Sequence, residues 1–172
     1  MTATVLQIQV IEAPESWRTV DFISDLHLQE KDTENFKVWR DYMASTSADA
    51  VFILGDLFEV WVGDDAVQKH VFLKQCAAVL KDCASKRHVA FMRGNRDFLV
   101  GPDFLNACQV QDLQDPMVLR FAKQNWLLSH GDEACLDDVD YQAFRRMVRQ
   151  ADWQQNFLAK PLSEREAIAL HL

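Results

Sequence analysis

The strongest constraint on the fold of this chain is a repeated pattern of four short apolar runs. Each run is followed at once by a polar turn that bears Asp, Asn or His. The runs lie at 20–24, 50–54, 88–92 and 126–129. The first three alternate with helical patterns, and a strand–helix–strand order favours an α/β domain with a mainly parallel sheet. Ligands of open α/β sheets gather at the carboxyl ends of the strands, so we expect the turns to meet there.

Helical spacing and alternation predict the remaining elements. In chain order we expect a strand over 4–11, helices over 33–44 and 66–84, a hairpin of 117–121 and 126–129 joined through 122–125, and helices from 138 onwards with a break near Pro161. Asp32 or Thr33 is the expected cap of the first helix.

Length and charge narrow the class of protein. The 172 residues suit one domain, and a net charge of −8 disfavours nucleic acid binding as the main activity. No basic and apolar leader or run of ~20 apolar residues is present, so a cytoplasmic protein is the expectation. No cysteine pair has CxxC spacing, which predicts reduced and mostly buried thiols at Cys76, Cys83, Cys108 and Cys135.

The polar turns supply a set of candidate metal ligands with mixed oxygen and nitrogen donors. They are Asp25, His27, Asp56, Asn95 and His130. Carboxylate, amide and imidazole donors suit Mn²⁺, Fe²⁺ or Zn²⁺ better than Ca²⁺. Each residue alone is typical of an ordinary turn or helix cap, but their order and their place after apolar runs favour a site.

Local geometry supports this interpretation at two places. Asp25 and His27 are two residues apart, and on an extended strand end they would point to the same side. Gly55 and Gly94 precede Asp56 and Asn95, and would let the backbone turn tightly and approach the ions.

The ordered motifs Asp25-Leu26-His27, Gly55-Asp56, Gly94-Asn95-Arg96 and the later His130 resemble those of the calcineurin-like metallophosphoesterases. The resemblance implies a layered β-sandwich flanked by helices (αββα). It also implies two divalent ions, with Mn²⁺ as the expected metal. Asp25 and His27 would bind the first ion, Asn95 and His130 the second, and Asp56 would bridge both.

Two longer blocks are more specific. The segments ILGDLFEVWVGDD (53–65) and GNRDFL (94–99) resemble the UDP-2,3-diacylglucosamine hydrolases of lipid A biosynthesis. The resemblance implies that water attacks the α-phosphorus of UDP-2,3-diacylglucosamine, which gives UMP and 2,3-diacylglucosamine 1-phosphate. A different phosphoesterase of the superfamily and a non-catalytic fragment remain alternatives.

By the resemblance, Arg96 occupies the position at which most calcineurin-like phosphoesterases carry His. An Arg cannot protonate a leaving group at neutral pH, but its planar fork suits a phosphate. We therefore assign Arg96 a catalytic role in charge stabilisation, and a role in diphosphate binding beside Asn95. An ion pair with Asp97 or another neighbour is the alternative.

The segment after His130 also resembles the hydrolase family, which implies that Asp138 and Tyr141 lie near the polar head of the substrate. A helix cap at Asp138 and simple packing of Tyr141 are the alternatives. Asp132 is expected to fix His130 by a hydrogen bond. Asp64 and Asp65 are expected in a solvated turn.

The resemblance divides the chain into a core over 1–137 and the beginning of a helical cap over 138–172, which in the family receives acyl chains. It implies a UDP-linked lipid as partner and peripheral contact with the cytoplasmic face of the inner membrane. The closing G-H-x-H motif of the family is absent. We therefore expect an incomplete core, one histidine fewer for each metal, doubtful activity, and a homodimer formed through the exposed core.

Overall fold

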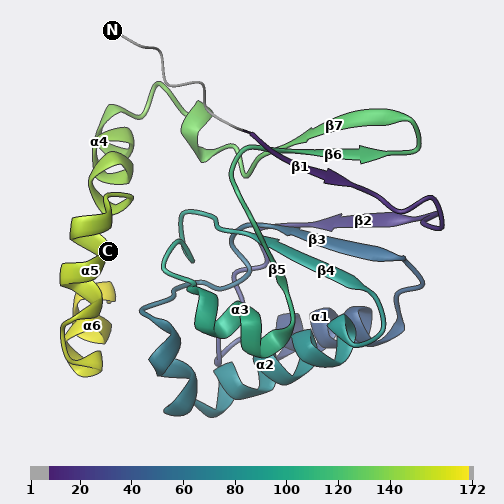
Figure 1. Ribbon diagram of the computed structural model, residues 1–172. Helices are drawn as coiled ribbons and strands as arrows, with labels where there is room; N and C mark the ends of the chain where they lie inside the picture. Colours follow the sequence, from purple (N-terminus) through teal and green to yellow (C-terminus); the bar gives the residue numbers. More distant parts are fainter. Residues whose placement is uncertain (1–7, 171–172) are drawn as a thin grey trace, which may run out of the picture.

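The computed structural model describes residues 8–170, which form two stacked sheets with helices on one side (Figure 1). The four-stranded sheet has the order β2-β3-β4-β5, with all neighbours parallel. The three-stranded sheet has the order β1-β6-β7, in which β1 is parallel to β6 and β7 antiparallel to it. The strands are β1 Gln9–Glu12, β2 Val20–Ile23, β3 Ala50–Leu54, β4 His88–Met92, β5 Gln111–Leu113, β6 Met117–Phe121 and β7 Gln124–Leu128.

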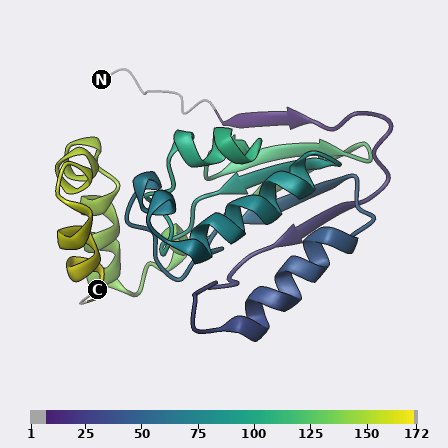
Figure 2. The same cartoon turned by 90° about the horizontal axis from the view of Figure 1, so that it is seen from below.

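The helices fall into two groups. Those named α1 Thr33–Ser45, α2 Val71–Ala84 and α3 Pro102–Cys108 cover the outer face of the four-stranded sheet (Figures 1 and 2). The helices α4 Val139–Val148, α5 Ala151–Leu158 and α6 Leu162–Ala169 form a separate stack beside the sheets. The layered α/β fold is therefore confirmed, while the domain division at residue 138 stays a prediction.

Strand β3 lies at the centre of the fold and is buried on both faces. Val51 and Ile53 pack into the core between the four-stranded sheet and the helices. Ala50 and Phe52 pack into a second core between the two sheets. Because both faces of a parallel strand are covered, it reads as a continuous apolar run, as the sequence showed.

Several predicted elements are confirmed within the described residues. Strands β3 and β4 have the predicted bounds, and Asp32 caps α1 by accepting a hydrogen bond from the Asn35 amide at 3.1 Å. Strand β1 overlaps the end of the predicted 4–11 strand and extends one residue beyond it, while positions 4–7 lie outside the described residues. No helix in the described range has the length and apolarity to cross a membrane.

The predicted start of the second helix is wrong. Helix α2 begins at Val71, and the preceding residues form a short 3-10 helix, η1 Asp64–Gln68. His70 between them has extended backbone, with φ −107° and ψ 122°, which separates the two.

The hairpin is confirmed, but its turn is shorter than predicted. Ala122 and Lys123 alone join β6 to β7, with φ of 53° and 63°. These are unusual values for residues other than Gly, Asn or Asp, so the sequence carried no signal for this turn. All four cysteines are free thiols, and three are buried while Cys135 is exposed.

Candidate metal centre

The pairing of β2 with β3 continues beyond both strands and brings two polar turns together. The Asp25 amide donates to the Gly55 carbonyl at 3.1 Å, and the His27 amide donates to the Asp56 carbonyl at 3.0 Å. The turn after β2 is thereby fixed against the turn after β3, at the carboxyl edge of the sheet where ligand sites form.

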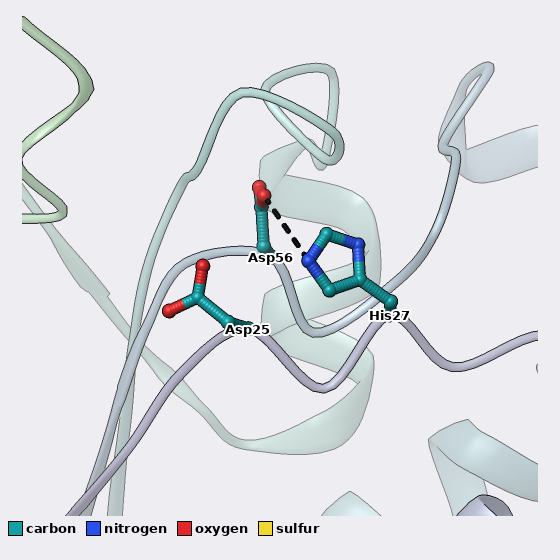
Figure 3. Close-up of side chains that lie close together, drawn as sticks. All are labelled: Asp25, His27 and Asp56. Carbon is teal, nitrogen blue, oxygen red and sulfur yellow. Dashed lines mark ion pairs between the residues drawn. The ribbon is translucent and has the colours of Figure 1, made fainter. Parts of the chain in front are cut away.

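Three of the predicted ligands share an uncommon backbone conformation. Asp25, His27 and Asp56 have φ of 55°, 50° and 53°, in the left-handed region. The extended geometry that we predicted for Asp25 and His27 is therefore wrong. Their side chains nevertheless face one centre, since one ligand atom from each of the three lies within 4.8 Å of the others (Figure 3). Left-handed non-glycine residues often cluster at functional sites.

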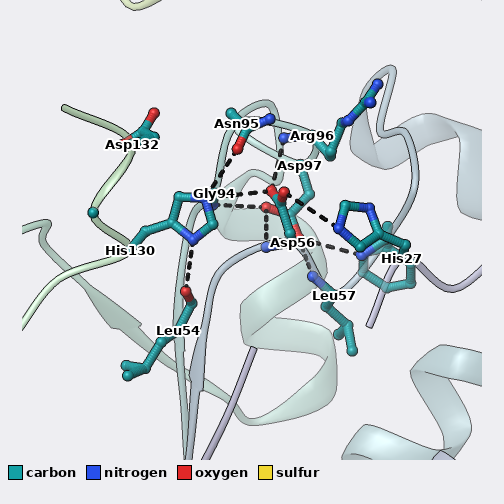
Figure 4. A network of polar contacts seen from close by, with 12 residues as sticks. His27, Leu54, Asp56, Leu57, Gly94, Asn95, Arg96, Asp97, His130 and Asp132 are labelled. Carbon is teal, nitrogen blue, oxygen red and sulfur yellow. Dashed lines mark hydrogen bonds and ion pairs between the residues drawn. The ribbon is translucent and has the colours of Figure 1, made fainter. Parts of the chain in front are cut away.

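The carboxylate of Asp56 lies between two groups of ligands. Its Oδ2 is 3.8 Å from His27 Nε2, on the side of Asp25, and its Oδ1 is 3.8 Å from His130 Nε2 (Figure 4). On that second side, His130 Nε2 is 3.0 Å from Asn95 Oδ1. The structure thus brings together all five residues predicted as metal ligands.

The hydrogen bonds of His130 show that this group suits a cation. Its Nδ1 lies 2.9 Å from the Leu54 carbonyl oxygen, which can only accept, so Nδ1 donates this hydrogen bond. Nε2 faces Asn95 Oδ1 at 3.0 Å and Asp56 Oδ1 at 3.8 Å. Imidazole, amide and carboxylate donors that converge in this way fit a divalent metal.

The second histidine has the same arrangement. His27 Nδ1 lies 3.1 Å from Glu59 Oε2, while Nε2 faces Asp56. A carboxylate next to Nδ1 favours a proton on that nitrogen and leaves Nε2 free to bind a metal.

Beneath these ligands, the buried carboxylate of Asp97 holds the two loops in place. It accepts hydrogen bonds from the amides of Gly94 and Leu57, both at 2.8 Å, and of Asp56 and Phe58, both at 3.3 Å. Burial raises the pKa of Asp97 to about 6, although these amide hydrogen bonds act in the opposite direction.

The two loops approach so closely that glycine is required at their contact. A Cβ on Gly94 would overlap the Asp56 carboxylate, and one on Gly55 would lie 2.5 Å from His130 Nδ1. Gly55 also has φ of 92°, which side chains rarely permit. The glycines thus permit the contact between the two loops, while the predicted approach of the backbone to the ions stays a prediction.

Arg96 lies at the rim of this centre. Its amide donates to Asp56 Oδ1 at 2.8 Å, while its side chain is 46% exposed with Nη1 3.9 Å from Glu59 Oε1. The alternative ion pair does form, but with Glu59 as the neighbour and not with Asp97, whose carboxylate accepts from backbone amides. The guanidinium is therefore held next to the ligands and open to solvent.

The residues after His130 form a network of their own. Asp132 accepts from the Tyr141 hydroxyl at 2.6 Å and from Arg145 Nε at 2.9 Å. The prediction that Asp132 accepts a hydrogen bond from His130 is wrong, because His130 Nδ1 donates to the Leu54 carbonyl instead. Asp138 caps α4 by accepting from the Tyr141 amide at 2.9 Å. Substrate contacts of Asp138 and Tyr141 stay predictions.

Asp64 and Asp65 have structural partners. Asp64 accepts from the amides of Gly101 at 2.8 Å and Phe104 at 2.9 Å, so it caps α3 from a distant part of the chain. Asp65 pairs with Arg165 of α6, with Oδ1 2.9 Å from Nη1. The solvated turn that we predicted is wrong for Asp64, and Asp65 is exposed but paired.

Sequence reasoning missed two residues of the site, Glu59 and Asp97. Glu59 lies three positions after Asp56, at the end of the turn that follows β3, and a carboxylate so close to predicted ligands was an available signal. Nothing in the sequence separates the buried Asp97 from an ordinary turn aspartate.

The chain has a layered α/β fold, and at one edge of its sheet a carboxylate lies between two histidines. This combination is typical of a metal-dependent phosphoesterase. The family model of the calcineurin-like phosphoesterases matches residues 18–171, and the chain belongs to this family. The resemblance drawn from the short motifs is confirmed.

Curated relatives carry a more specific name. Proteins named UDP-2,3-diacylglucosamine hydrolase from Chromobacterium violaceum and Aromatoleum aromaticum are 45% and 40% identical, over 88% and 86% of this chain. A protein of that name from Chromohalobacter salexigens is 38% identical over 90% of the chain. The alignments cover 64%, 60% and 63% of those proteins, so this chain spans less than two thirds of their length.

Proposed function

We propose that this chain acts in the metal-dependent hydrolysis of UDP-2,3-diacylglucosamine in lipid A biosynthesis. Water attacks the α-phosphorus, the pyrophosphate bond breaks, and the products are UMP and 2,3-diacylglucosamine 1-phosphate. The observation that carries the proposal is the position of the Asp56 carboxylate, with one oxygen toward His27 and the other toward His130. The names of the curated relatives supply the substrate.

Two divalent ions fit the ligand set, and Mn²⁺ is the metal we propose. Asp25 and His27 would hold one ion and Asn95 and His130 the other, with Asp56 between them. Such a pair of ions lowers the pKa of the attacking water and stabilises charge on the phosphoryl oxygens.

Arg96 would bind the diphosphate beside Asn95. Its exposed guanidinium can form two parallel hydrogen bonds to phosphate oxygens and stays charged at neutral pH. Because it cannot donate a proton, its contribution is to stabilise charge that develops as the anhydride bond breaks. Asp138, which caps α4, and Tyr141 in its first turn would contact the polar head of the substrate.

The test is release of UMP from UDP-2,3-diacylglucosamine by this chain, in ¹⁸O-labelled water, with and without added Mn²⁺. Metal-dependent release with the label in UMP supports both the substrate and attack at the α-phosphorus. Label in the sugar phosphate would reverse the position of attack. Hydrolysis of simple phosphodiesters alone would favour another phosphoesterase of the family, and a chain that binds Mn²⁺ without hydrolysing any substrate would favour a non-catalytic module.

The lipid substrate leads to a proposal about location, namely peripheral contact with the cytoplasmic face of the inner membrane. Exposed apolar side chains on and beside α4–α6 support it: Leu136, Val139, Met147, Leu158 and Leu170. Co-sedimentation with phospholipid vesicles tests it, and equal recovery of the parent and of Leu136→Ser/Val139→Ser in the pellet would contradict it.

The homodimer expected through exposed core is a further part of the proposal. Val10 and Leu127 are exposed on the outer face of the three-stranded sheet, next to Val118 in the strand register. A monomeric mass in sedimentation equilibrium would contradict it.

A further inference from the structure

We propose that Glu59 is a positioning residue of the metal centre, which sets the tautomer and orientation of the His27 ring. The inference rests on the proposed metal ligands. It does not depend on the identity of the substrate.

The backbone places Glu59 against the His27 segment. The Leu28 amide donates to the Leu57 carbonyl at 2.8 Å, and the Glu59 amide donates back to the Leu28 carbonyl at 3.2 Å. Leu28 and Phe58 form a parallel bridge beyond the ends of β2 and β3. Phe58 is fully buried, so the position of Glu59 relative to His27 is fixed by backbone pairing and packing.

The two histidines of the site depend on different kinds of partner. His130 is 5% exposed, and the backbone carbonyl of Leu54 orients its ring. His27 is 36% exposed, and the Glu59 carboxylate is its Nδ1 partner, at 3.1 Å. A carboxylate behind a metal-binding histidine selects the Nδ1–H tautomer and raises the basicity of Nε2. A single substitution, at Glu59, can therefore remove the partner of His27, whereas the partner of His130 belongs to the backbone. We expect such a substitution to weaken metal binding on the His27 side.

Glu59 also connects this ligand with the rim of the site. While Oε2 faces His27, Oε1 lies 3.9 Å from Arg96 Nη1. Both side chains are partly exposed, so this ion pair is weak and leaves the guanidinium open to solvent.

The test compares three variants with a matched control. Glu59→Ala removes both contacts, Glu59→Asp keeps the charge but shortens the reach, and Glu59→Gln keeps an oxygen that accepts from Nδ1–H. Glu30→Ala removes another exposed carboxylate, three positions after His27 in the sequence, and is the control. The readouts are the ¹⁵N shifts of the His27 ring in metal-free protein, assigned with His27→Gln, and Mn²⁺ affinity by calorimetry.

We expect the Nδ1–H tautomer in the parent, in Glu59→Gln and in the control. Glu59→Ala and Glu59→Asp should show a tautomer mixture and Mn²⁺ binding weakened about 10–100-fold on the His27 side. The Nδ1–H tautomer together with control-like Mn²⁺ affinity in Glu59→Ala would overturn the proposal. If that variant does not fold, the same result in Glu59→Asp overturns it. Neither readout involves substrate, so failure of the UMP assay would leave this test intact.

Discussion

The buried carboxylate of Asp97 accepts a hydrogen bond from the backbone amide of Asp56, at 3.3 Å, and thereby fixes the residue that lies between the two ligand groups. The same carboxylate binds the Gly94 amide at 2.8 Å, on the other loop. Asp97 is 0% exposed, so no water can replace it in either contact. The positions of Asp56 and Asn95 thus depend on one carboxylate that binds backbone amides of both loops.

Replacing Asp97 by Asn should damage the centre without removing a ligand. The amide has one accepting oxygen, and its NH₂ group would face backbone N–H donors. We expect a loss of about 1–3 kcal/mol in the free energy of unfolding. Urea unfolding measures the stability, and calorimetry the accompanying loss of Mn²⁺ affinity. Asp137→Asn, an exposed change of the same chemistry, should alter neither; equal behaviour of both variants would contradict the role of Asp97.

Arg96 should contribute to turnover and not to metal binding. We expect Arg96→Ala to lower kcat/KM for UMP release about 100-fold, with Mn²⁺ affinity unchanged. Arg96→Lys should recover little of this, because an ammonium group cannot reproduce the planar fork. Full activity of Arg96→Lys would show that charge alone suffices, and a parallel loss of Mn²⁺ would move Arg96 into the metal site.

The pair of Asp65 with Arg165 should make the stability of the protein depend on pH. The hydrogen bond from Arg165 holds the pKa of Asp65 below its ordinary value, and Arg165 is itself only 3% exposed. A depressed folded-state pKa means that the contribution is complete above the unfolded pKa, near ~4, and is lost as pH falls through the folded value.

Asp65→Asn should therefore lower the free energy of unfolding at neutral pH, by about 1 kcal/mol after allowance for solvent screening at the exposed carboxylate. The difference between parent and variant should shrink as pH falls below ~4. Urea unfolding across this range measures it, with Asp103→Asn on the exposed side of α3 as the control. A difference that stays constant with pH would contradict the pairing.

The sequence predicted those parts of the fold that repeat a simple pattern. β3 and β4 are apolar on both faces, so their bounds follow from composition alone. Helix α1 combines a cap at Asp32 with buried Trp39 and Met43, and was predicted for the same reason. The convergence of the turns followed from parallel topology.

The parts of the fold and of the site that were not predicted depend on contacts between residues far apart in the sequence, which a local pattern does not contain. Asp64 accepts hydrogen bonds from amides at the start of α3, about forty residues further along the chain. The short elements α3 and β5 were not predicted. At the site, the meeting of the five candidate ligands was predicted, but the left-handed backbone of Asp25 and His27 and the partner of His130 were not. These depend on backbone pairing between loops.

The most direct measurement is a Mn²⁺ titration of the parent chain followed by electron paramagnetic resonance. Asp56 between two ligand groups predicts two ions per chain and a spin-coupled pair, since ions that share a carboxylate lie about 3.5–4 Å apart. His130→Ala should leave one uncoupled ion on the side of His27, and Asp56→Asn should abolish the coupling. A single ion at saturation in the parent, or two ions without coupling, would contradict the bridging position of Asp56.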